Sequence, residues 1–147
     1  MVGDAQGRQA YVKQIERDIA ELDLIECTRL AGHCMDMPAA LKAADIVLAP
    51  SLKPEAFGRT AAEAAAMARP VIAANHGGSM ETVIDGETGA RFEPGNISAL
   101  AGSIRSMMSI GPVARAGMGQ TGRDHVRQHF SRPVSYTHLT LPTIYSV

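Results

Sequence analysis

Aromatic residues are scarce in this chain of 147 residues, which contains no Trp, three Phe and three Tyr. Proteins that bind single-stranded nucleic acid without sequence preference rely on aromatic side chains that stack on the bases. The composition therefore argues against such a stacking platform. The formal net charge is −1, so electrostatics also gives no reason to expect nucleic acid or an anionic membrane as a partner.

Cysteines are few as well, and long apolar runs are absent from the sequence. The spacing of Cys27 and Cys34 fits neither a metal-ligand motif nor a disulfide framework, so we expect reduced thiols. No apolar run reaches the roughly 18 residues that cross a bilayer, and no signal peptide is visible. We therefore expect a protein without a transmembrane segment that is cytoplasmic, or lies at the inner face of the membrane in its full-length form.

What the chain does contain is an alternation of short apolar runs and amphipathic segments. Hydrophobic residues make up 46% and charged residues 20%, which is ordinary globular composition. Strands alternating with helices over short connections predict an α/β fold, a Rossmann-like open and mainly parallel sheet with helices on both faces. The expected strands are 25–31, 45–49, 70–74 and 90–92, and the expected helices are 12–22, a brief one after Asp36, 59–68, 79–84, one capped by Asn96, and 112–129.

Both ends of the chain indicate a piece of a longer protein. Met1–Gly3 looks like the end of a strand whose beginning is missing. From Val134 the sequence VSYTHLTLPT resembles an in-frame translation of an adapter used in DNA sequencing libraries; the alternative is a genuine β-rich tail. We expect one Rossmann-like domain over residues 1–133, incomplete at its N-terminus, and a non-native tail over 134–147.

Two turn-rich loops stand out in the middle of the chain. The first, Glu55–Gly58, precedes the expected helix that starts at Arg59, and the second, Asn75–Gly78, follows a buried strand. Ligands of open parallel sheets bind beyond the carboxyl ends of the strands. Free backbone N–H groups and the helix dipole at Arg59 favour an anion such as a phosphate. The glycines of the second loop leave room for a ligand to approach the backbone.

Two carboxylates accompany these loops. Glu55 lies before the helix and Glu63 about one turn into it. Carboxylates at these two positions can accept hydrogen bonds from vicinal sugar hydroxyls. The alternative for Glu63 is a surface residue in an intrahelical ion pair, and for Glu55 a first-turn acid that only complements the helix dipole. His76 in the second loop either donates to a phosphate or sugar or is hydrogen-bonded to the backbone.

These residues together resemble the retaining glycosyltransferases of family four, the group-one transferases with the GT-B fold. The family signature reads P-S-x-x-E-x-F-G, then E-A and P-V-I-A, then a glycine-rich loop, E-T-V and G-x-T-G. In this sequence the matching residues are Pro50-Ser51, Glu55–Gly58, Glu63-Ala64, Pro70–Ala73, His76–Gly78, Glu81–Val83 and Gly86–Gly89. The looser match extends from Val2 to Phe130, and the E-A-F-G-R-T form resembles transferases that build bacterial lipopolysaccharide cores or related polysaccharides.

The resemblance implies a role for each matched position. Glu55 would contact the hydroxyls of the transferred sugar and is the predicted catalytic residue. The backbone N–H groups of Phe57 and Gly58 would face the sugar and diphosphate, and Glu63 would hold the ribose hydroxyls. The remaining predicted donor-binding residues are Gly32, which would flank the base, Arg59, Thr60, His76, Gly77 and Gly78.

The resemblance also implies the reaction. A sugar would pass, with retention at the anomeric carbon, from a nucleoside diphosphate sugar to a carbohydrate or lipid-linked acceptor held by an N-terminal domain that this sequence lacks. The expected reaction uses no metal and no cofactor, and no D-x-D pair is present to hold Mg²⁺ against a diphosphate. The cationic Arg and Lys that neutralise the leaving group in the family lie upstream of this sequence, so we expect the fragment to be inactive alone.

Three alternatives remain open beside this interpretation. The chain could be a non-catalytic sugar-nucleotide-binding module, or part of a sugar-nucleotide epimerase with the same architecture, although the E-x₇-E spacing argues against the epimerase. A dinucleotide oxidoreductase is disfavoured because no G-x-G-x-x-G follows a first strand. Ala68 stands where the family often has glycine, and we expect this change to lengthen the preceding helix slightly.

Overall fold

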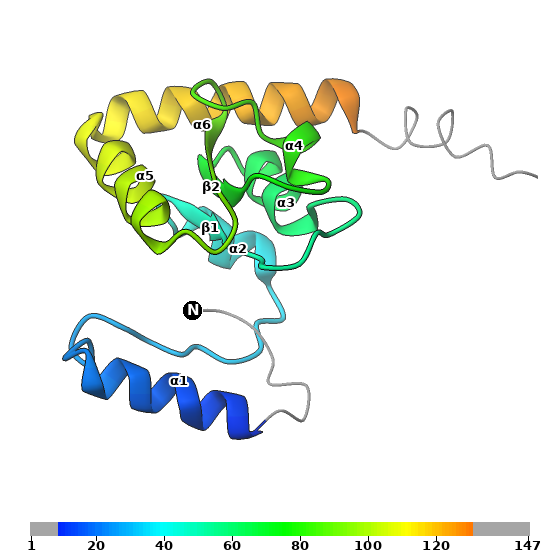
Figure 1. The fold of residues 1–147 in the computed structure, drawn as a ribbon. Coiled ribbons are helices and arrows are strands. Elements are labelled where there is room, and N and C mark those ends of the chain that lie inside the picture. The colour runs from blue at the N-terminus through cyan, green and yellow to red at the C-terminus, as the bar shows by residue number, and fades with distance from the viewer. Residues whose placement is uncertain (1–8, 131–147) are drawn as a thin grey trace, which may run out of the picture. The chain divides into compact units, whose positions relative to one another are not determined.

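The computed structural model describes residues 9–130, which divide into two compact units between Ala40 and Leu41 (Figure 1). Each unit is described by itself. The predicted strand end Met1–Gly3, the domain boundary at residue 133 and the tail 134–147 lie outside the described residues.

The N-terminal unit contains the helix α1, Gln9–Glu21. The apolar side chains Val12, Ile15 and Ile19, spaced by three and four residues, are half-buried, whereas Leu22 just after the helix is exposed. The predicted strand 25–31 is wrong: these residues form turns and irregular chain, and the backbone hydrogen bond from the Cys27 amide to the Leu24 carbonyl is local. A strand persists only where a neighbouring strand satisfies its backbone groups, and this segment pairs with none of the described strands.

A short helix, α2, Met37–Lys42, crosses the division between the units. It begins as predicted, because a carboxylate oxygen of Asp36 accepts a hydrogen bond of 2.9 Å from the Ala39 amide. This bond satisfies one of the backbone donors that every helix leaves free in its first turn.

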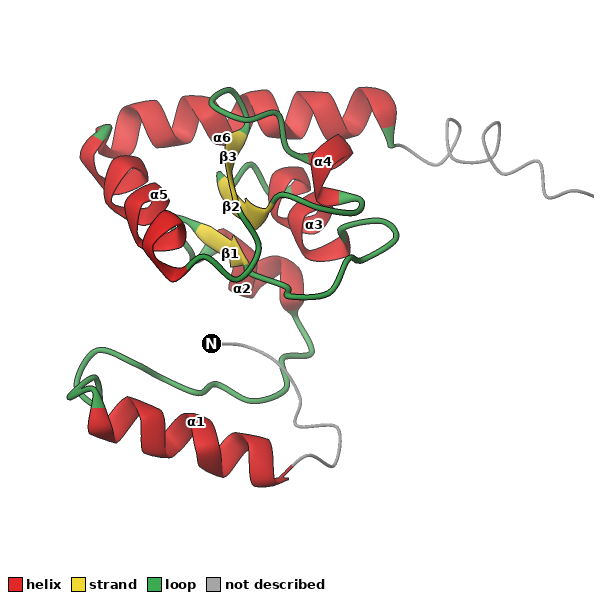
Figure 2. Ribbon diagram, in the orientation of Figure 1, coloured by secondary structure: helices red, strands yellow, loops and turns green. Residues whose placement is uncertain are grey.

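The C-terminal unit is built on a parallel sheet of three strands in the order β1-β2-β3 (Figure 2). The strands are β1, Val47–Ala49, β2, Val71–Ala74, and β3, Gly89–Phe92. Every residue of the central strand β2 is buried, as expected for a strand covered on both faces. The predicted open parallel sheet is confirmed, with strand 45–49 two residues shorter than expected.

Four helices complete this unit: α3, Arg59–Ala66; α4, Ser79–Thr82; α5, Ile97–Ser109; and α6, Gly111–His129. In Figure 2, α5 and α3 lie on opposite sides of the sheet. Side chains alternate between the faces of a strand, so Ile72 and Ala74 point to the α5 side, where they form a core with Phe92 and Met107. The predicted cap of α5 is confirmed, since Asn96 Oδ1 accepts from the Ala99 amide at 2.9 Å.

Small residues set the spacing between α3 and its neighbours. Ala61, Ala64 and Ala65 are buried and let the helix approach the sheet closely. On the facing helix, a Cβ atom at Gly119 would overlap the Ala68 carbonyl, and one at Gly122 would lie 3.4 Å from Thr88 Cβ. The close packing of α6 against α3 therefore depends on residues without bulky side chains.

The end of α3 corrects one expectation. The helix stops at Ala66 rather than at Ala68, and Ala68 has a φ of 55°. This left-handed conformation costs an L-residue about 1–2 kcal/mol relative to glycine. The turn that glycine would favour is thus formed by alanine, and two backbone hydrogen bonds close it, from the Ala68 amide to the Ala65 carbonyl at 2.8 Å and from the Arg69 amide to the Ala64 carbonyl at 3.0 Å.

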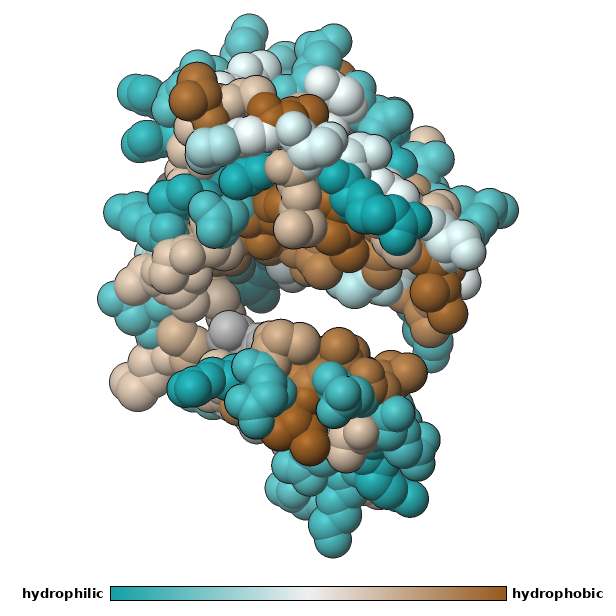
Figure 3. Space-filling view, turned by 90° about the vertical axis from the view of Figure 1, so that its left-hand side faces the viewer, coloured by the Kyte–Doolittle hydropathy of each residue, from teal (hydrophilic) through white to brown (hydrophobic). Residues whose placement is uncertain are grey.

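The surface of the described residues is mixed in polarity. Figure 3 shows apolar patches separated by hydrophilic side chains. The most exposed large apolar side chains of the α5 and α6 region are Ile97, Met108 and Val113. Among residues 9–130, no helix combines the length and the apolar character needed to cross a membrane.

Candidate functional site

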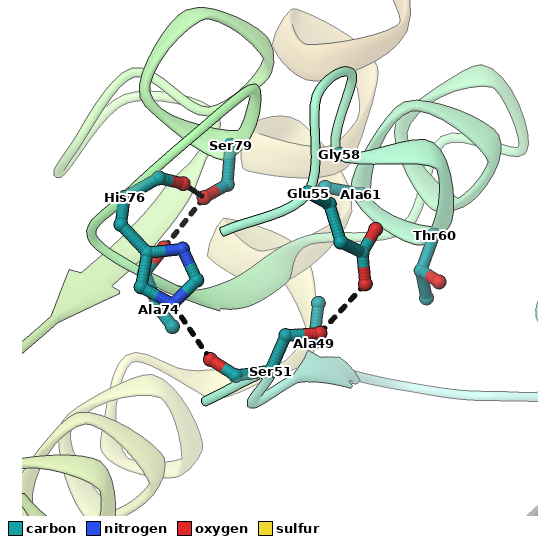
Figure 4. Close-up of a pocket in the computed structure, with 9 residues that line it drawn as sticks. All are labelled: Ala49, Ser51, Glu55, Gly58, Thr60, Ala61, Ala74, His76 and Ser79. Atoms are coloured by element: carbon teal, nitrogen blue, oxygen red, sulfur yellow. Dashed lines mark hydrogen bonds between the residues drawn. The ribbon is translucent and has the colours of Figure 1, made fainter. Parts of the chain in front are cut away.

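A pocket opens at the carboxyl ends of β1 and β2. Ala49 and Ala74, the last residues of these two strands, form its floor. Its other lining residues come from the connection between β1 and α3, residues 50–58, which includes the first loop, and from the start of α3. The rest come from the second loop, residues 75–78, and from the start of α4 (Figure 4). They are Ser51, Glu55, Gly58, Thr60, Ala61, His76 and Ser79. This is the edge of a parallel sheet where ligands bind in open α/β folds.

Glu55 presents its carboxylate to this pocket. Its side chain accepts a hydrogen bond of 2.6 Å from the Ser51 hydroxyl, through the oxygen Oε1 (Figure 4). The backbone carbonyl of Glu55 accepts a second hydrogen bond, 2.8 Å long, from the Gly78 amide. A carboxylate has acceptor capacity for about four hydrogen bonds, so Oε2 and the second lone pair of Oε1 remain available for hydroxyl donors.

The two loops pack directly against each other through their backbones. A Cβ atom at Gly77 would overlap the Glu55 carbonyl, and one at Gly78 would overlap the backbone of Phe57. A Cβ at Gly58 would lie 2.8 Å from the Ser79 nitrogen. Glycine is therefore required in both loops by their contact with each other, which is a reason that the sequence analysis did not anticipate.

The start of α3 faces the pocket with little obstruction. Gly58 is buried with a φ of 64°, whereas Phe57, Arg59 and Thr60 are exposed. No side chain among the described residues caps this helix start. A helix N-terminus without a side-chain cap keeps backbone donors and the positive end of the dipole available to an anion.

Glu63 lies farther along α3 and is not among the residues that line the pocket. Its carboxylate pairs with Arg59 Nε at 3.3 Å, and the two side chains are 47% and 82% exposed respectively. The intrahelical pair that was one alternative for Glu63 is thus present. An exposed pair of this kind contributes little stability and is easily exchanged for other partners. The ribose contact of Glu63 and the phosphate contact of Arg59 stay predictions.

His76 is bonded to the first loop. Its Nε2 lies 2.8 Å from the Ser51 carbonyl oxygen, and because a carbonyl only accepts, Nε2 carries the proton. Its Nδ1 is buried and has no hydrogen-bond partner among the described residues. The backbone-bonded alternative for His76 is therefore present in the structure, and a contact between His76 and a donor stays a prediction.

Two serines in this site were not predicted from the sequence to have a role. Ser51 was noted only as part of the motif, yet its hydroxyl holds Glu55. Ser79 is buried, and its hydroxyl reaches the carbonyls of Ala74 at 2.5 Å and His76 at 2.6 Å. The signal that was available is position: each serine comes at the junction between a strand-end loop and the next element.

The end of α6 also reaches the site. The rings of Phe130 and Phe57 meet edge to face with their centroids 5.7 Å apart, and His125 Nε2 lies 2.9 Å from the Glu81 carbonyl oxygen. The C-terminal end of α6 therefore contacts the first loop and α4, while Arg123, Arg127 and His129 are exposed.

Two further expectations complete the account of the site. Gly32 belongs to the N-terminal unit, where it is exposed with a φ of 68°, and its contact with a base stays a prediction. Within residues 9–130, no group of three or more His, Cys, Asp or Glu side chains is arranged to hold a metal ion.

Comparison with known proteins shows the family. The model of the family described as "Glycosyl transferases group 1" matches residues 1–125. The chain is 34% identical over 109 residues to a glycogen synthase of Mycobacterium tuberculosis (strain CDC 1551 / Oshkosh), covering 73% of this chain and 26% of that protein. It is 30% identical over 131 residues to the capsular polysaccharide biosynthesis glycosyltransferase CapM of Staphylococcus aureus, covering 86% of this chain and 34% of CapM.

The fold is also similar to that of a solved structure. The crystal structure of Anabaena HepE (Alr3699) in complex with UDP-glucose superposes with a TM-score of 0.85 at 32% identity, covering 95% of this chain and 40% of that chain. The chain thus spans between about a quarter and two fifths of the length of these three proteins.

Proposed function

The chain belongs to the group 1 glycosyl transferases, and we propose that it is the donor-binding domain, the C-terminal half of the GT-B fold, of a retaining enzyme. The full enzyme would transfer a sugar from a nucleoside diphosphate sugar to a carbohydrate or lipid-linked acceptor. The observation that carries this proposal is the pocket at the carboxyl ends of β1 and β2, where the Glu55 carboxylate lies beside the uncapped start of α3.

Each side of the pocket suits one part of such a donor. The amide end of α3, at Phe57 and Gly58, offers N–H donors and a dipole of the sign that attracts a diphosphate. The free acceptor capacity of Glu55 suits the vicinal hydroxyls of the transferred sugar. We assign the ribose hydroxyls to Glu63, which would exchange its exposed pair with Arg59 for them.

The rest of the enzyme is proposed to lie outside this chain. An N-terminal domain would bind the acceptor, close over the donor and contribute the cations that neutralise the leaving diphosphate, so that no metal or other cofactor is needed. Catalysis of group transfer depends on such positioning and charge stabilisation, so the isolated chain would bind a donor without turning it over.

The cellular role proposed for the full enzyme is the synthesis of bacterial cell-surface polysaccharide or lipopolysaccharide. The support is the E-A-F-G-R-T form of the first loop and the likeness to CapM. We place the full enzyme in the cytoplasm or at the inner face of the membrane, where nucleoside diphosphate sugars are the activated donors.

Isothermal titration calorimetry on the 147-residue chain tests the proposal directly. UDP-glucose, ADP-glucose and GDP-mannose are titrated in turn, with glucose alone as the control. We expect one nucleotide sugar to bind more tightly than the others, and no sugar release or transfer to an added oligosaccharide. Absence of binding by all three would contradict the donor-binding proposal, and robust transfer by the isolated chain would contradict the proposal that essential parts lie elsewhere.

A further inference from the structure

We infer that Ser51 and His76 are positioning residues, which act on the transferred sugar only by holding the Glu55 carboxylate in place. This inference rests on the proposed function, because the orientation of Glu55 matters to catalysis only if its carboxylate binds the donor sugar. The residues concerned line one pocket and are drawn together in Figure 4.

The first step is the bond between Ser51 and Glu55. The side chain of Glu55 is exposed, and a free glutamate on a surface samples many rotamers. Its Oε1 is bound at 2.6 Å by the Ser51 hydroxyl, which is a short, charge-assisted hydrogen bond. Restricting the carboxylate before the sugar arrives removes an ordering cost that the sugar contacts would otherwise have to offset.

The second step is the bond that holds Ser51. Its carbonyl oxygen accepts from His76 Nε2 at 2.8 Å, across 25 positions of sequence, so the first loop is tied to the second. The carbonyl of His76 in turn accepts from the buried hydroxyl of Ser79. The result is a chain of hydrogen bonds from the interior, at Ser79, through His76 and Ser51 to the exposed carboxylate of Glu55.

The third step excludes a direct contact of the imidazole with the donor in this arrangement. Nε2 is already used by the Ser51 carbonyl, and Nδ1 is buried. Neither ring nitrogen is therefore presented to a ligand in the pocket. A direct ligand contact would require the ring to leave Ser51, which would also release the loop that carries Glu55.

The main test compares two ligands on the full 147-residue chain. We expect Ser51→Ala to weaken UDP-glucose binding by roughly three- to tenfold and to leave UDP binding unchanged, because Glu55 faces the sugar and not the nucleotide. Ser51→Thr keeps a hydroxyl and should restore most of the affinity. Ser106→Ala, an exposed serine of α5, is the matched control. Equal weakening of both ligands by Ser51→Ala, or of neither, would overturn the inference.

A double-mutant cycle separates positioning from direct contact. On a Glu55→Gln background, Ser51→Ala should cause no further loss of UDP-glucose affinity, since the two residues act as one unit. His76→Ala should reproduce the selective loss of Ser51→Ala, and His76→Gln, which keeps an N–H donor, should recover part of it. Full additivity of Ser51→Ala and Glu55→Gln would contradict the inference.

A readout without ligand keeps this inference distinct from the proposed function. Side-chain couplings measured by NMR should show one dominant rotamer for Glu55 in the unmodified chain and averaging in Ser51→Ala. If the unmodified chain binds neither UDP-glucose nor UDP nor another nucleotide sugar, the proposed function fails, and the couplings still decide the positioning roles. Averaged couplings of Glu55 in both proteins would show that Ser51 does not hold it.

Discussion

The two loops of the pocket have similar places in the chain and different physical roles. Each follows a strand, contains glycine and precedes a helix, although β2 is buried throughout and Leu48 of β1 is exposed. In the first loop the side chains of Glu55 and Phe57 are exposed, whereas in the second Gly78 is buried and its amide donates to the first loop. One loop therefore presents groups to a ligand, and the other supplies the surface on which the first is seated. The comparison teaches that glycine in a strand-end loop marks close approach, and that the approaching partner is here another loop.

The largest effect is expected from the supporting loop. In Gly78→Ala the new Cβ overlaps the backbone of Phe57, which is unable to move aside as a flexible side chain would. We expect a loss of about 3 kcal/mol in the free energy of unfolding, measured by urea denaturation, because overpacking against backbone forces the two loops apart.

The matched control for Gly78→Ala is Gly102→Ala, in the middle of α5, where a Cβ would meet open space. Replacing a helical glycine by alanine should raise the free energy of unfolding by about 0.5–1 kcal/mol. Equal stability of the two variants would remove the distinction between a glycine needed for contact and one that is not.

The next effect concerns the serine beneath the second loop. Ser79→Ala removes a buried hydroxyl that donates to the carbonyls of Ala74 and His76. Because the Ala74 carbonyl also accepts from the His76 amide at 2.9 Å, the net loss is about one hydrogen bond, and the free energy of unfolding should fall by about 1 kcal/mol. Ser109→Ala, whose exposed hydroxyl donates to the Ser106 carbonyl, should change stability by less than about 0.5 kcal/mol. If thermal or urea unfolding of the two variants coincides, Ser79 is not the anchor described here.

The first loop should show the opposite pattern. Glu55→Gln should leave the urea midpoint unchanged, since its side chain is exposed, and should weaken UDP-glucose binding by roughly tenfold, because hydrogen bonds to a charged acceptor are the stronger ones. Glu87→Gln, an exposed glutamate of the turn before β3, is the control for both measurements. A Glu55→Gln variant that unfolds more easily and binds the donor normally would reverse the roles assigned to the two loops.

The smallest effect is expected at Arg59. Its exposed pair with Glu63 contributes too little to detect in unfolding, so Arg59→Ala should keep the stability of the unmodified chain. If Arg59 approaches the diphosphate, its removal should weaken UDP binding by roughly threefold at low salt and less at about 0.5 M salt, where surface charges are screened. Arg105→Ala on α5 is the control. A UDP affinity that does not respond to Arg59→Ala would leave Arg59 as a surface residue only.

The elements of the C-terminal unit were predicted well, because there the local sequence preferences agree with the tertiary packing. Residues that are neighbours in the sequence determine the strand within the apolar run 70–74, the Asn96 cap and the bounds of α6. All three are found in the structure. The loop residues could be singled out for the same reason, since the motif itself marks them. Their hydrogen-bonding partners could not: the bond between His76 and the Ser51 carbonyl joins residues far apart in sequence.

The expectations that failed depended on tertiary partners. Residues 25–31 have the composition of a strand, and without a paired neighbour among the described residues they form turns instead. Ala68 was expected to prolong α3 on helix propensity alone, yet it lies in a left-handed turn beside Gly119. Propensity is a weak guide wherever the packing of another helix fixes the backbone.

The most direct test of the account is a titration of the ¹⁵N-labelled 147-residue chain with UDP-glucose, followed by amide NMR shifts. We expect the largest shifts at Phe57, Gly58, Arg59 and Thr60, with the amides of α5 nearly unchanged. Shifts that concentrate on α5, or an unchanged spectrum at saturating UDP-glucose, would contradict the claim that the start of α3 binds the donor.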